Sequence, residues 1–335
     1  MREEAGKYRG QQRNTGRWVE QDGPFDVFED ICRCVLSDEA FVSAMRLHPL
    51  ADASPLRRLT SAPIKELYRQ IFDAVVAHTP WIYVETMPEG GLSSAAHIIG
   101  KRLKADIHEV AVHHCVIFSG AQKCRSGDVL GELLASFSLT ELNGSVVDKR
   151  FRLTNAFLDK YGGNHVPIYL LVDQSQYLTP IIVDELSLLG ARLLEEGLQL
   201  GLMFFGAATD ESDMRNLFAQ RLASELPSTM LRLGGYGEVY EIMSLLQCID
   251  SQRDETGRTW TQFFVPRLFA AGYRLEGEAS GLFEAMEEQA RIDRLPVSVR
   301  RLFIAIKRFL VYAHGFDGTS FKGTVNAWRW ALGPG

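Results

Sequence analysis

The chain has 335 residues and a formal net charge of −6, with 46% hydrophobic and 23% charged residues. This length allows about two domains, and the composition is ordinary for a globular protein with a sizeable core. The negative net charge gives no reason to expect that the protein as a whole attracts nucleic acid. A local basic face is still compatible with this charge. The sequence has no run of about 18 apolar residues, no signal peptide and no zinc-ligand spacing of its five cysteines, so we predict a cytoplasmic protein with free thiols.

The N-terminal part is predicted to be an arm followed by helices. Residues 1–24 are rich in Arg, Gln and Gly and are expected to form a flexible basic arm. Apolar residues at helical spacing over 25–45 then mark an N-terminal helical segment, for which we expect the bounds 25–65. A proline-containing stretch interrupts that pattern, and a helix is expected over about 64–76.

From residue 81 the chain alternates between apolar runs and helical patterns. The short, nearly continuous apolar runs are typical of buried parallel strands and cover 81–85, 110–119, 166–174, 198–207 and 229–233. The helical patterns between them cover 93–104, 126–139, 150–162, 180–196 and 213–224. After residue 235 only helical patterns follow, at 237–249, 260–271, 279–291, 297–313 and 321–331. The sequence therefore predicts a three-layer α/β core over 66–235 and an all-helical lid domain over 236–335.

The turn after the first predicted strand has the context of a phosphate-binding loop. Ligands of open α/β sheets bind beyond the carboxyl ends of the strands, and here the sequence reads ETMPEGGLSS over 85–94. Aligned with the P-loop pattern G-x-x-x-x-G-K-[ST], Thr86 replaces the first glycine and Leu92 replaces the lysine. Leu92 cannot neutralise the β- and γ-phosphates, and Glu89 adds a negative charge. The candidate residues of this vestigial nucleotide site are Pro88, Glu89, Gly90, Gly91, Ser93 and Ser94.

Two interpretations of this turn stay open. Backbone amides at the start of the following helix could still hold a phosphate weakly. Alternatively, the segment is a glycine-rich turn with a serine cap and no ligand.

The third predicted strand ends like a Walker B motif, with four apolar residues before Asp173. An aspartate in this place would hold Mg²⁺, usually through water, if a nucleotide binds. Hydrolases of this type carry a glutamate in the next position, where it orients or deprotonates the attacking water. Gln174 stands there and cannot accept a proton, which predicts very slow hydrolysis. An aspartate that only caps the strand or the next helix is the alternative.

With these motifs in place, the order of elements resembles the AAA+ P-loop ATPase core followed by its helical lid. Within that group the chain looks most like the TniB/TnsC regulators of transposition, in which a Gly-Thr sensor and a helix ending in Ala-Ser-Arg follow the Walker B strand. The corresponding segments here are MFFGAAT over 203–209 and QRLASE over 220–225. The resemblance implies a sensor at Thr209 and puts Glu225 at the arginine-finger position, with Arg221 one turn earlier as a possible substitute.

The resemblance also implies a role. TniB/TnsC-type proteins bind ATP, assemble as filaments or rings on DNA, and connect a transposase to its target. The replacements at Leu92, Gln174 and Glu225 predict a pseudo-ATPase with no catalytic residues, in which ATP or ADP with Mg²⁺ binds weakly if at all. We therefore expect a non-hydrolysing scaffold of a mobile element, a homo- or hetero-oligomer whose partners are a transposase or a related AAA+ protein and DNA.

Two other functions stay open at this stage. The first is an active noncanonical ATPase in which another basic residue replaces the missing lysine. The second is a DNA-free protein-interaction module of P-loop ancestry.

Clusters of basic residues offer candidate contacts to a DNA backbone. Such clusters can bind phosphates, but more often they are solvated helix faces whose aliphatic stems cover the core. The candidates are Lys101, Arg102, Arg300, Arg301, Lys307 and Arg308. His113 and His114 do not form a metal pair in this prediction, because neighbouring residues of a strand point to opposite faces.

Overall fold

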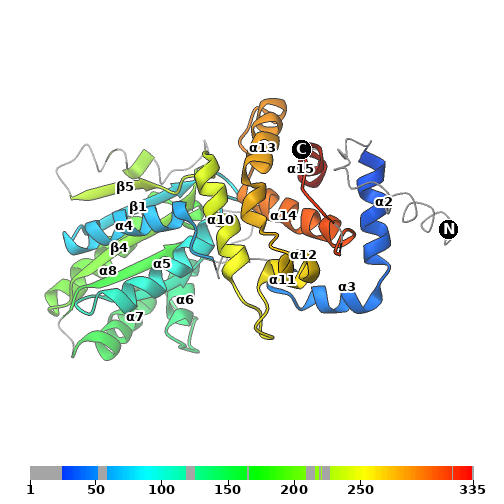
Figure 1. The fold of residues 1–335 in the computed structure, drawn as a ribbon. Helices are drawn as coiled ribbons and strands as arrows, with labels where there is room; N and C mark the ends of the chain where they lie inside the picture. The colour runs from blue at the N-terminus through cyan, green and yellow to red at the C-terminus, as the bar shows by residue number, and fades with distance from the viewer. Residues whose placement is uncertain are drawn as a thin grey trace, which may run out of the picture.

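The computed structural model describes residues 25–51, 59–117, 125–163, 166–208, 216–218, 220, 227–318 and 320–333. The described elements form an α/β half and a helical half, with α10 (Val239–Ser251) between them (Figure 1). Among these residues, no helix is both long enough and apolar enough to span a membrane.

One parallel sheet forms the centre of the α/β half. Its strands are β1 (Trp81–Thr86), β2 (Ala111–Val116), β3 (Ile168–Asp173), β4 (Leu200–Ala207) and β5 (Ser228–Arg232). Their order is β2-β3-β4-β1-β5, and every neighbouring pair is parallel. The carboxyl ends of all strands therefore meet at one edge, where Asp173 pairs with Phe205 and Glu85 with Gly206. This confirms the predicted parallel sheet and brings the ends of β1 and β3 to the two sides of β4.

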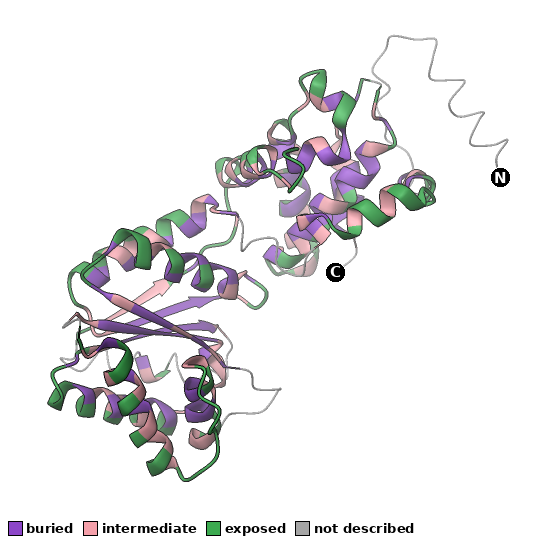
Figure 2. Cartoon of the chain, turned by 90° about the horizontal axis from the view of Figure 1, so that it is seen from below, coloured by how far each residue is buried: buried purple, intermediate pink, exposed green. Residues whose placement is uncertain are grey.

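Helices cover both faces of the sheet, as Figure 2 shows. These helices are α4 (Ala62–Val76), α5 (Leu92–Asp106), α6 (Ser126–Ser136), α7 (Val146–Tyr161) and α8 (Pro180–Glu195). Helices α4 and α5 share an apolar cluster with Val84 and Phe205, whereas α6, α7 and α8 share another cluster with Tyr83 and Phe204. Successive strand residues thus serve opposite faces, which gives the predicted three-layer core.

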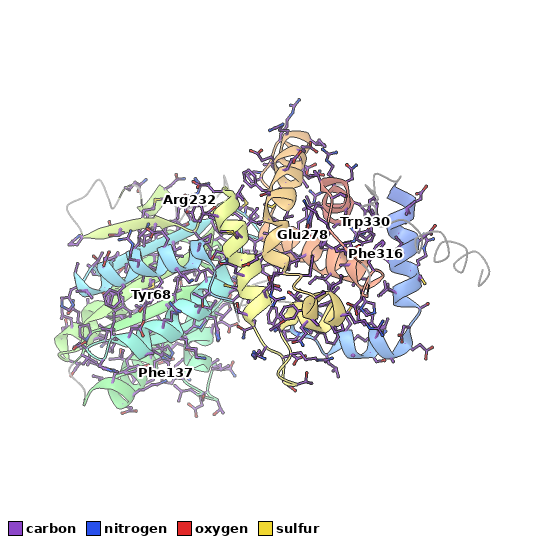
Figure 3. All side chains as sticks on the ribbon, viewed as in Figure 1. Tyr68, Phe137, Arg232, Glu278, Phe316 and Trp330 are labelled. Carbon is purple, nitrogen blue, oxygen red and sulfur yellow. The ribbon has the colours of Figure 1, made fainter. Side chains whose placement is uncertain are left out.

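The helical half is built from both ends of the chain. Its elements are α2 (Phe25–Leu36), α3 (Glu39–Arg46), η1 (Pro49–Ala51), α10, α11 (Trp260–Phe264), α12 (Pro266–Ala270), η4 (Leu275–Glu278), α13 (Ala279–Asp293), α14 (Val299–His314) and α15 (Val325–Leu332). Phe28 of α2 stacks on Trp330 of α15, which is labelled in Figure 3, with ring centroids 5.7 Å apart. Trp328 stacks on Phe309 at 3.7 Å. The N-terminal helices therefore pack into the core of the C-terminal helices, and the boundary predicted between residues 65 and 66 falls inside α4.

Two predicted helical stretches are divided in the structure. The spacing over 25–45 spans α2 and α3, which separate because the Asp38 carboxylate accepts hydrogen bonds from the amides of Ala40 and Phe41 and starts a new helix. The helix predicted over 260–271 ends at Phe264, and Pro266 begins α12 because proline has no amide to continue the earlier helix. In both places the apolar periodicity continues across the break, since both helices face the same core.

Candidate nucleotide-binding site

The turn between β1 and α5 lies at the carboxyl edge of the sheet, where the sequence predicts a phosphate-binding loop. Its glycines are required by the backbone: Gly91 has a φ of 82°, and a Cβ on Gly90 would lie 2.5 Å from Thr86 Oγ1. The Gly90 amide donates to the Met87 carbonyl at 3.0 Å. Thr86 Oγ1 donates to the Leu233 carbonyl, also at 3.0 Å. The first hydrogen bond closes the turn, and the second ties it to Leu233. The Gly90 N–H therefore already has a carbonyl partner within the chain.

Leu92, which the sequence alignment with the P-loop pattern places at the lysine position, has a side chain that is part of the core. It is 9% exposed and belongs to the apolar cluster that α4 and α5 form with the sheet. Burying a leucine stabilises a fold by about 1.5–3 kcal/mol. The segment 85–94 contains no lysine or arginine. The turn therefore has no cation of its own for a triphosphate, and the residue that replaced the cation contributes to packing.

The structure brings together the two predicted motifs through Ser93 and Asp173, which are 80 positions apart. Ser93 Oγ donates to Asp173 Oδ1 at 3.1 Å, and the Gln174 amide donates to the same oxygen at 2.8 Å. Asp173 is 3% exposed. A hydroxyl and a carboxylate in this arrangement are suitable oxygen ligands for Mg²⁺. Within the described residues no cluster of three or more His, Cys, Asp or Glu side chains could hold a metal, so an ion here would need nucleotide oxygens as well.

The turn after β3 provides no carboxylate for activating water. Gln174 occupies the position of the expected glutamate and has left-handed backbone angles, φ 62° and ψ 37°. Gln176 Oε1 accepts a hydrogen bond from the Ala207 amide at 3.2 Å and so ties this turn to the end of β4. Sequence analysis did not single out Gln176, although a polar side chain this close to Asp173 was a usable signal.

Three predicted site residues lie outside the described residues: Thr209, Arg221 and Glu225.

Glu89 joins the turn to the helical half. Its Oε1 accepts from Arg300 Nη1 at 2.8 Å, and its Oε2 accepts from Ser298 Oγ at 3.3 Å. The Glu89 carbonyl also accepts from the Arg300 amide at 3.3 Å. The first turn of α14 therefore lies on the turn after β1. Arg300, predicted as a candidate DNA contact, is placed at the candidate nucleotide site.

The space beside this contact is nearly filled. A cavity of about 10 Å³ lies there between the two halves, and its lining includes Ile64, Gly91, Tyr236 and Val299. Such a volume holds roughly one water molecule, whereas small-molecule sites typically measure about 300–1,000 Å³. A larger hollow of about 280 Å³ beside Trp81 lies at the amino end of the strands, away from these groups. The cavity beside the turn is therefore too small for a nucleotide base.

The other candidate DNA contacts are spread over α5 and α14. Arg301 pairs with Asp293 at 2.6 Å and donates to the Leu332 carbonyl, while Arg308 lies over the Trp330 ring. These two arginines hold the C-terminal helix. The remaining candidates differ in exposure: Lys101 is exposed, Lys307 is half-buried, and Arg102 is half-buried with its guanidinium over the Tyr68 ring (Figure 3). The prediction of DNA contact stays open for all six residues.

His113 is a core residue. Its Nδ1 lies 3.0 Å from Tyr161 Oη and its Nε2 lies 2.8 Å from Ser136 Oγ, while the ring stacks on Phe137 at 3.9 Å. Burial, and after it the neighbouring positive charge of Lys160, lower the pKa of His113 to about 3. The ring is therefore neutral at pH 7 and stabilises the contact between β2 and α7.

Comparisons with solved structures found proteins to which this chain is similar. The chain is similar to the Aeropyrum pernix ORC2 protein in its ADP form, with a TM-score of 0.51 and 15% identity, over 80% of this chain and 66% of that protein. It is also similar to the Aeropyrum pernix ORC1 protein in complex with DNA, with a TM-score of 0.44 and 12% identity over 83% and 84% of the two chains. No family model and no curated protein sequence matches the chain. The first similarity supports the fold alone, and the chain has the predicted AAA+-like P-loop NTPase fold.

Proposed function

We propose that this protein is a non-hydrolysing regulator with an AAA+-like fold, which acts as a scaffold between a protein partner and DNA. One observation carries the proposal: residues in and beside the two aligned motifs make structural contacts. Leu92 packs into the core, Glu89 binds the first turn of α14, and the Gln174 amide holds Asp173. These contacts support a site that stabilises the fold and connects its halves.

The chemistry of phosphoryl transfer explains why these replacements matter. The reaction needs cations around the transferred group and a residue that positions the attacking nucleophile. Leu92 supplies no charge, and Glu89 would repel a phosphate. A positioned general base contributes about 10²- to 10⁴-fold to a rate, and Gln174 cannot act as one. We therefore expect ATP turnover at the background level.

Exposed apolar side chains on the α/β half support the scaffold role. Helices α7 and α8 pack together. They carry apolar side chains that are 52–68% exposed: Val147, Phe151, Ile181 and Leu188. A protein partner that covered them would remove apolar surface from water. The identity of the partner, a transposase or a related AAA+ protein of a mobile element, rests on the sequence resemblance to TniB/TnsC regulators.

The DNA part of the proposal rests on the same resemblance and on exposed basic residues such as Lys101. It predicts that duplex DNA is retained and that the logarithm of the affinity falls linearly with the logarithm of the salt concentration. Fluorescence anisotropy with a labelled duplex measures this slope. Lys101→Ala is expected to reduce the slope by about one if Lys101 contacts a phosphate. Absence of DNA binding at low salt would favour the DNA-free interaction module.

Phosphate release tests the non-hydrolysing part. Purified protein with Mg-ATP, with and without DNA, is expected to match the control without protein, and Asp173→Ala is expected to give the same value. Turnover that disappears in Asp173→Ala would overturn this part of the proposal.

A noncanonical ATPase is the second candidate, and one contact favours it. The guanidinium of Arg300 lies at the turn, 2.8 Å from the Glu89 carboxylate, where it could replace the missing lysine after the halves open. This candidate predicts that wild-type protein binds a fluorescent ATP analogue with Mg²⁺ and that Arg300→Ala weakens the binding. The first candidate predicts no binding that depends on Arg300.

A further inference from the structure

The contact between Glu89 and α14 has the features of an anion-binding site. Helix α14 has 16 residues, so its first turn carries a well-developed positive end of the helix dipole. Ser298 caps this helix: its Oγ accepts from the Arg301 amide at 3.2 Å and donates its own proton to Glu89 Oε2. The Arg300 guanidinium contacts the other oxygen of the same carboxylate. Both oxygens of Glu89 are thus held by groups that proteins commonly use to bind phosphate.

The backbone of Glu89 is adapted to this contact. Its φ is 57°, in the left-handed region that residues other than glycine rarely adopt. Such a conformation persists only where surrounding contacts hold it in place. Here the Arg300 amide binds the Glu89 carbonyl, and the two side-chain contacts bind the carboxylate. The turn therefore directs an acidic side chain onto the first turn of α14, where backbone and side-chain donors point at it.

We propose that the Glu89 carboxylate is a built-in ligand that takes the place of a phosphate and holds the helical half closed on the turn after β1. Closure is then a property of the chain itself, and the anion site at α14 opens only when Glu89 leaves it. The small apolar cavity beside Val299 and Ile64 completes the closed interface. This inference does not depend on DNA, on a protein partner or on ATP turnover.

The expected strength of this latch is modest, because both side chains are partly solvated. The Arg300 and Glu89 side chains are 71% and 49% exposed. An exposed ion pair shifts an equilibrium by up to about fivefold, and a favourable charge at a helix terminus contributes a similar factor. Neutralising Glu89 is therefore expected to increase the open population by about 5- to 30-fold.

Hydrogen exchange of the full-length protein, without nucleotide, measures the opening. Glu89→Gln is expected to accelerate exchange by about 5- to 30-fold in peptides that cover the turn 86–91 and the start of α14. The matched control is Glu66→Gln, which removes a similarly exposed ion pair with Arg69 inside α4. The control is expected to leave both peptides unchanged. Equal exchange in Glu89→Gln and wild-type protein would overturn the latch, as would an equal effect of both substitutions.

A charge swap separates pairing from local disturbance. Glu89→Arg combined with Arg300→Glu is expected to return part of the lost protection, because an acid at position 300 also interacts favourably with the start of α14. Exchange in the double variant that is at least as fast as in either single variant would contradict a role for the pair.

Pyrophosphate is the probe for the anion site. In calorimetric titrations, Glu89→Gln is expected to bind pyrophosphate at least about fivefold more tightly than wild-type protein, in line with the strength of one exposed ion pair. Equal affinity in the two proteins would mean that Glu89 does not occupy the anion position. The hydrogen-exchange and pyrophosphate experiments contain no DNA, protein partner or ATP. They can therefore contradict the latch without contradicting the proposed function, and the tests of the proposed function can fail without affecting the latch.

Discussion

The ends of β1 and β3 meet in one site, yet they differ in what their acidic residues do. After β3, Asp173 is buried, and its carboxylate accepts hydrogen bonds from the Ser93 hydroxyl and the Gln174 amide of the α/β half. After β1, Glu89 is half-exposed and binds the helical half through Ser298 and Arg300. The buried acid thus connects elements of the α/β half, while the exposed acid connects the α/β half to the helical half.

The largest expected effect comes from restoring the lysine of the P-loop. Leu92→Lys is expected to lower the free energy of unfolding by on the order of 3 kcal/mol, because it places an unpaired ammonium in an apolar cluster. Denaturant unfolding measures the loss. The control Leu92→Met keeps the volume and is expected to cost less than about 1.5 kcal/mol. A stable Leu92→Lys variant that hydrolyses ATP would show that the turn is still a working cradle.

The buried side of the comparison is tested by Asp173→Ala. The substitution leaves the Ser93 hydroxyl and the Gln174 amide without their acceptor, so we expect a loss of about 1–3 kcal/mol in the free energy of unfolding. Thermal or denaturant unfolding gives the value. Asp173→Asn keeps one carbonyl oxygen and is expected to cost less. No change in either variant would mean that Asp173 has no structural role.

A pH titration compares the cores of the two halves. Burial lowers the pKa of His113 in the α/β half to about 3 and that of His48 in the helical half to about 4. Between these values and the ordinary histidine pKa of about 6.5, the unfolded chain binds more protons than the folded chain, so stability falls as the pH falls. Each histidine contributes at most about 1.4 kcal/mol per pH unit. The stabilising effect is fully present above about pH 6.5.

Unfolding experiments between pH 4 and pH 7 on wild-type protein, His113→Gln and His48→Gln measure the contributions of the two histidines. Each substitution is expected to reduce the pH slope. An unchanged slope in one variant would show that the corresponding ring is not held neutral.

Salt is expected to have the smallest effect, and it distinguishes the two acidic residues. Raising the ionic strength screens the exposed Glu89–Arg300 pair, worth up to about 1 kcal/mol, and hardly affects buried contacts. Hydrogen exchange should accelerate in the turn 86–91 and stay constant at the end of β3. Equal salt sensitivity at both places would remove the contrast between them.

The parallel sheet was predictable because it depends on local patterns. Buried parallel strands form apolar runs that end at similar places in the sequence and in the structure, as in IYLLVD over 168–173. Once β1 and β3 are assigned to one parallel sheet, their carboxyl ends must lie at the same edge. The hydrogen bond between Ser93 and Asp173 also depends on the strand order, which was not predicted from the sequence.

The contact between Glu89 and Arg300 could not be located from the sequence. The two residues are 211 positions apart, and their meeting depends on how the helical half lies against the sheet. Sequence analysis identified Glu89 as an acid in an anion site and Arg300 as a basic residue near a helix start, but it assigned Arg300 to DNA as a candidate. A half-exposed carboxylate can be solvated without a cationic partner, so the sequence carries no signal for this contact. The packing of α2 against α15 was unpredictable for the same reason, because Phe28 and Trp330 lie near opposite ends of the sequence.

The central claim is that the turn after β1 is a structural contact that no longer holds a nucleotide. Hydrogen exchange of the wild-type protein over 86–95, with and without millimolar Mg-ATP, tests it most directly. We predict the same exchange rates in both conditions, because the Gly90 amide and the Glu89 side chain already have partners within the chain. Strong protection of this segment by Mg-ATP would contradict the claim.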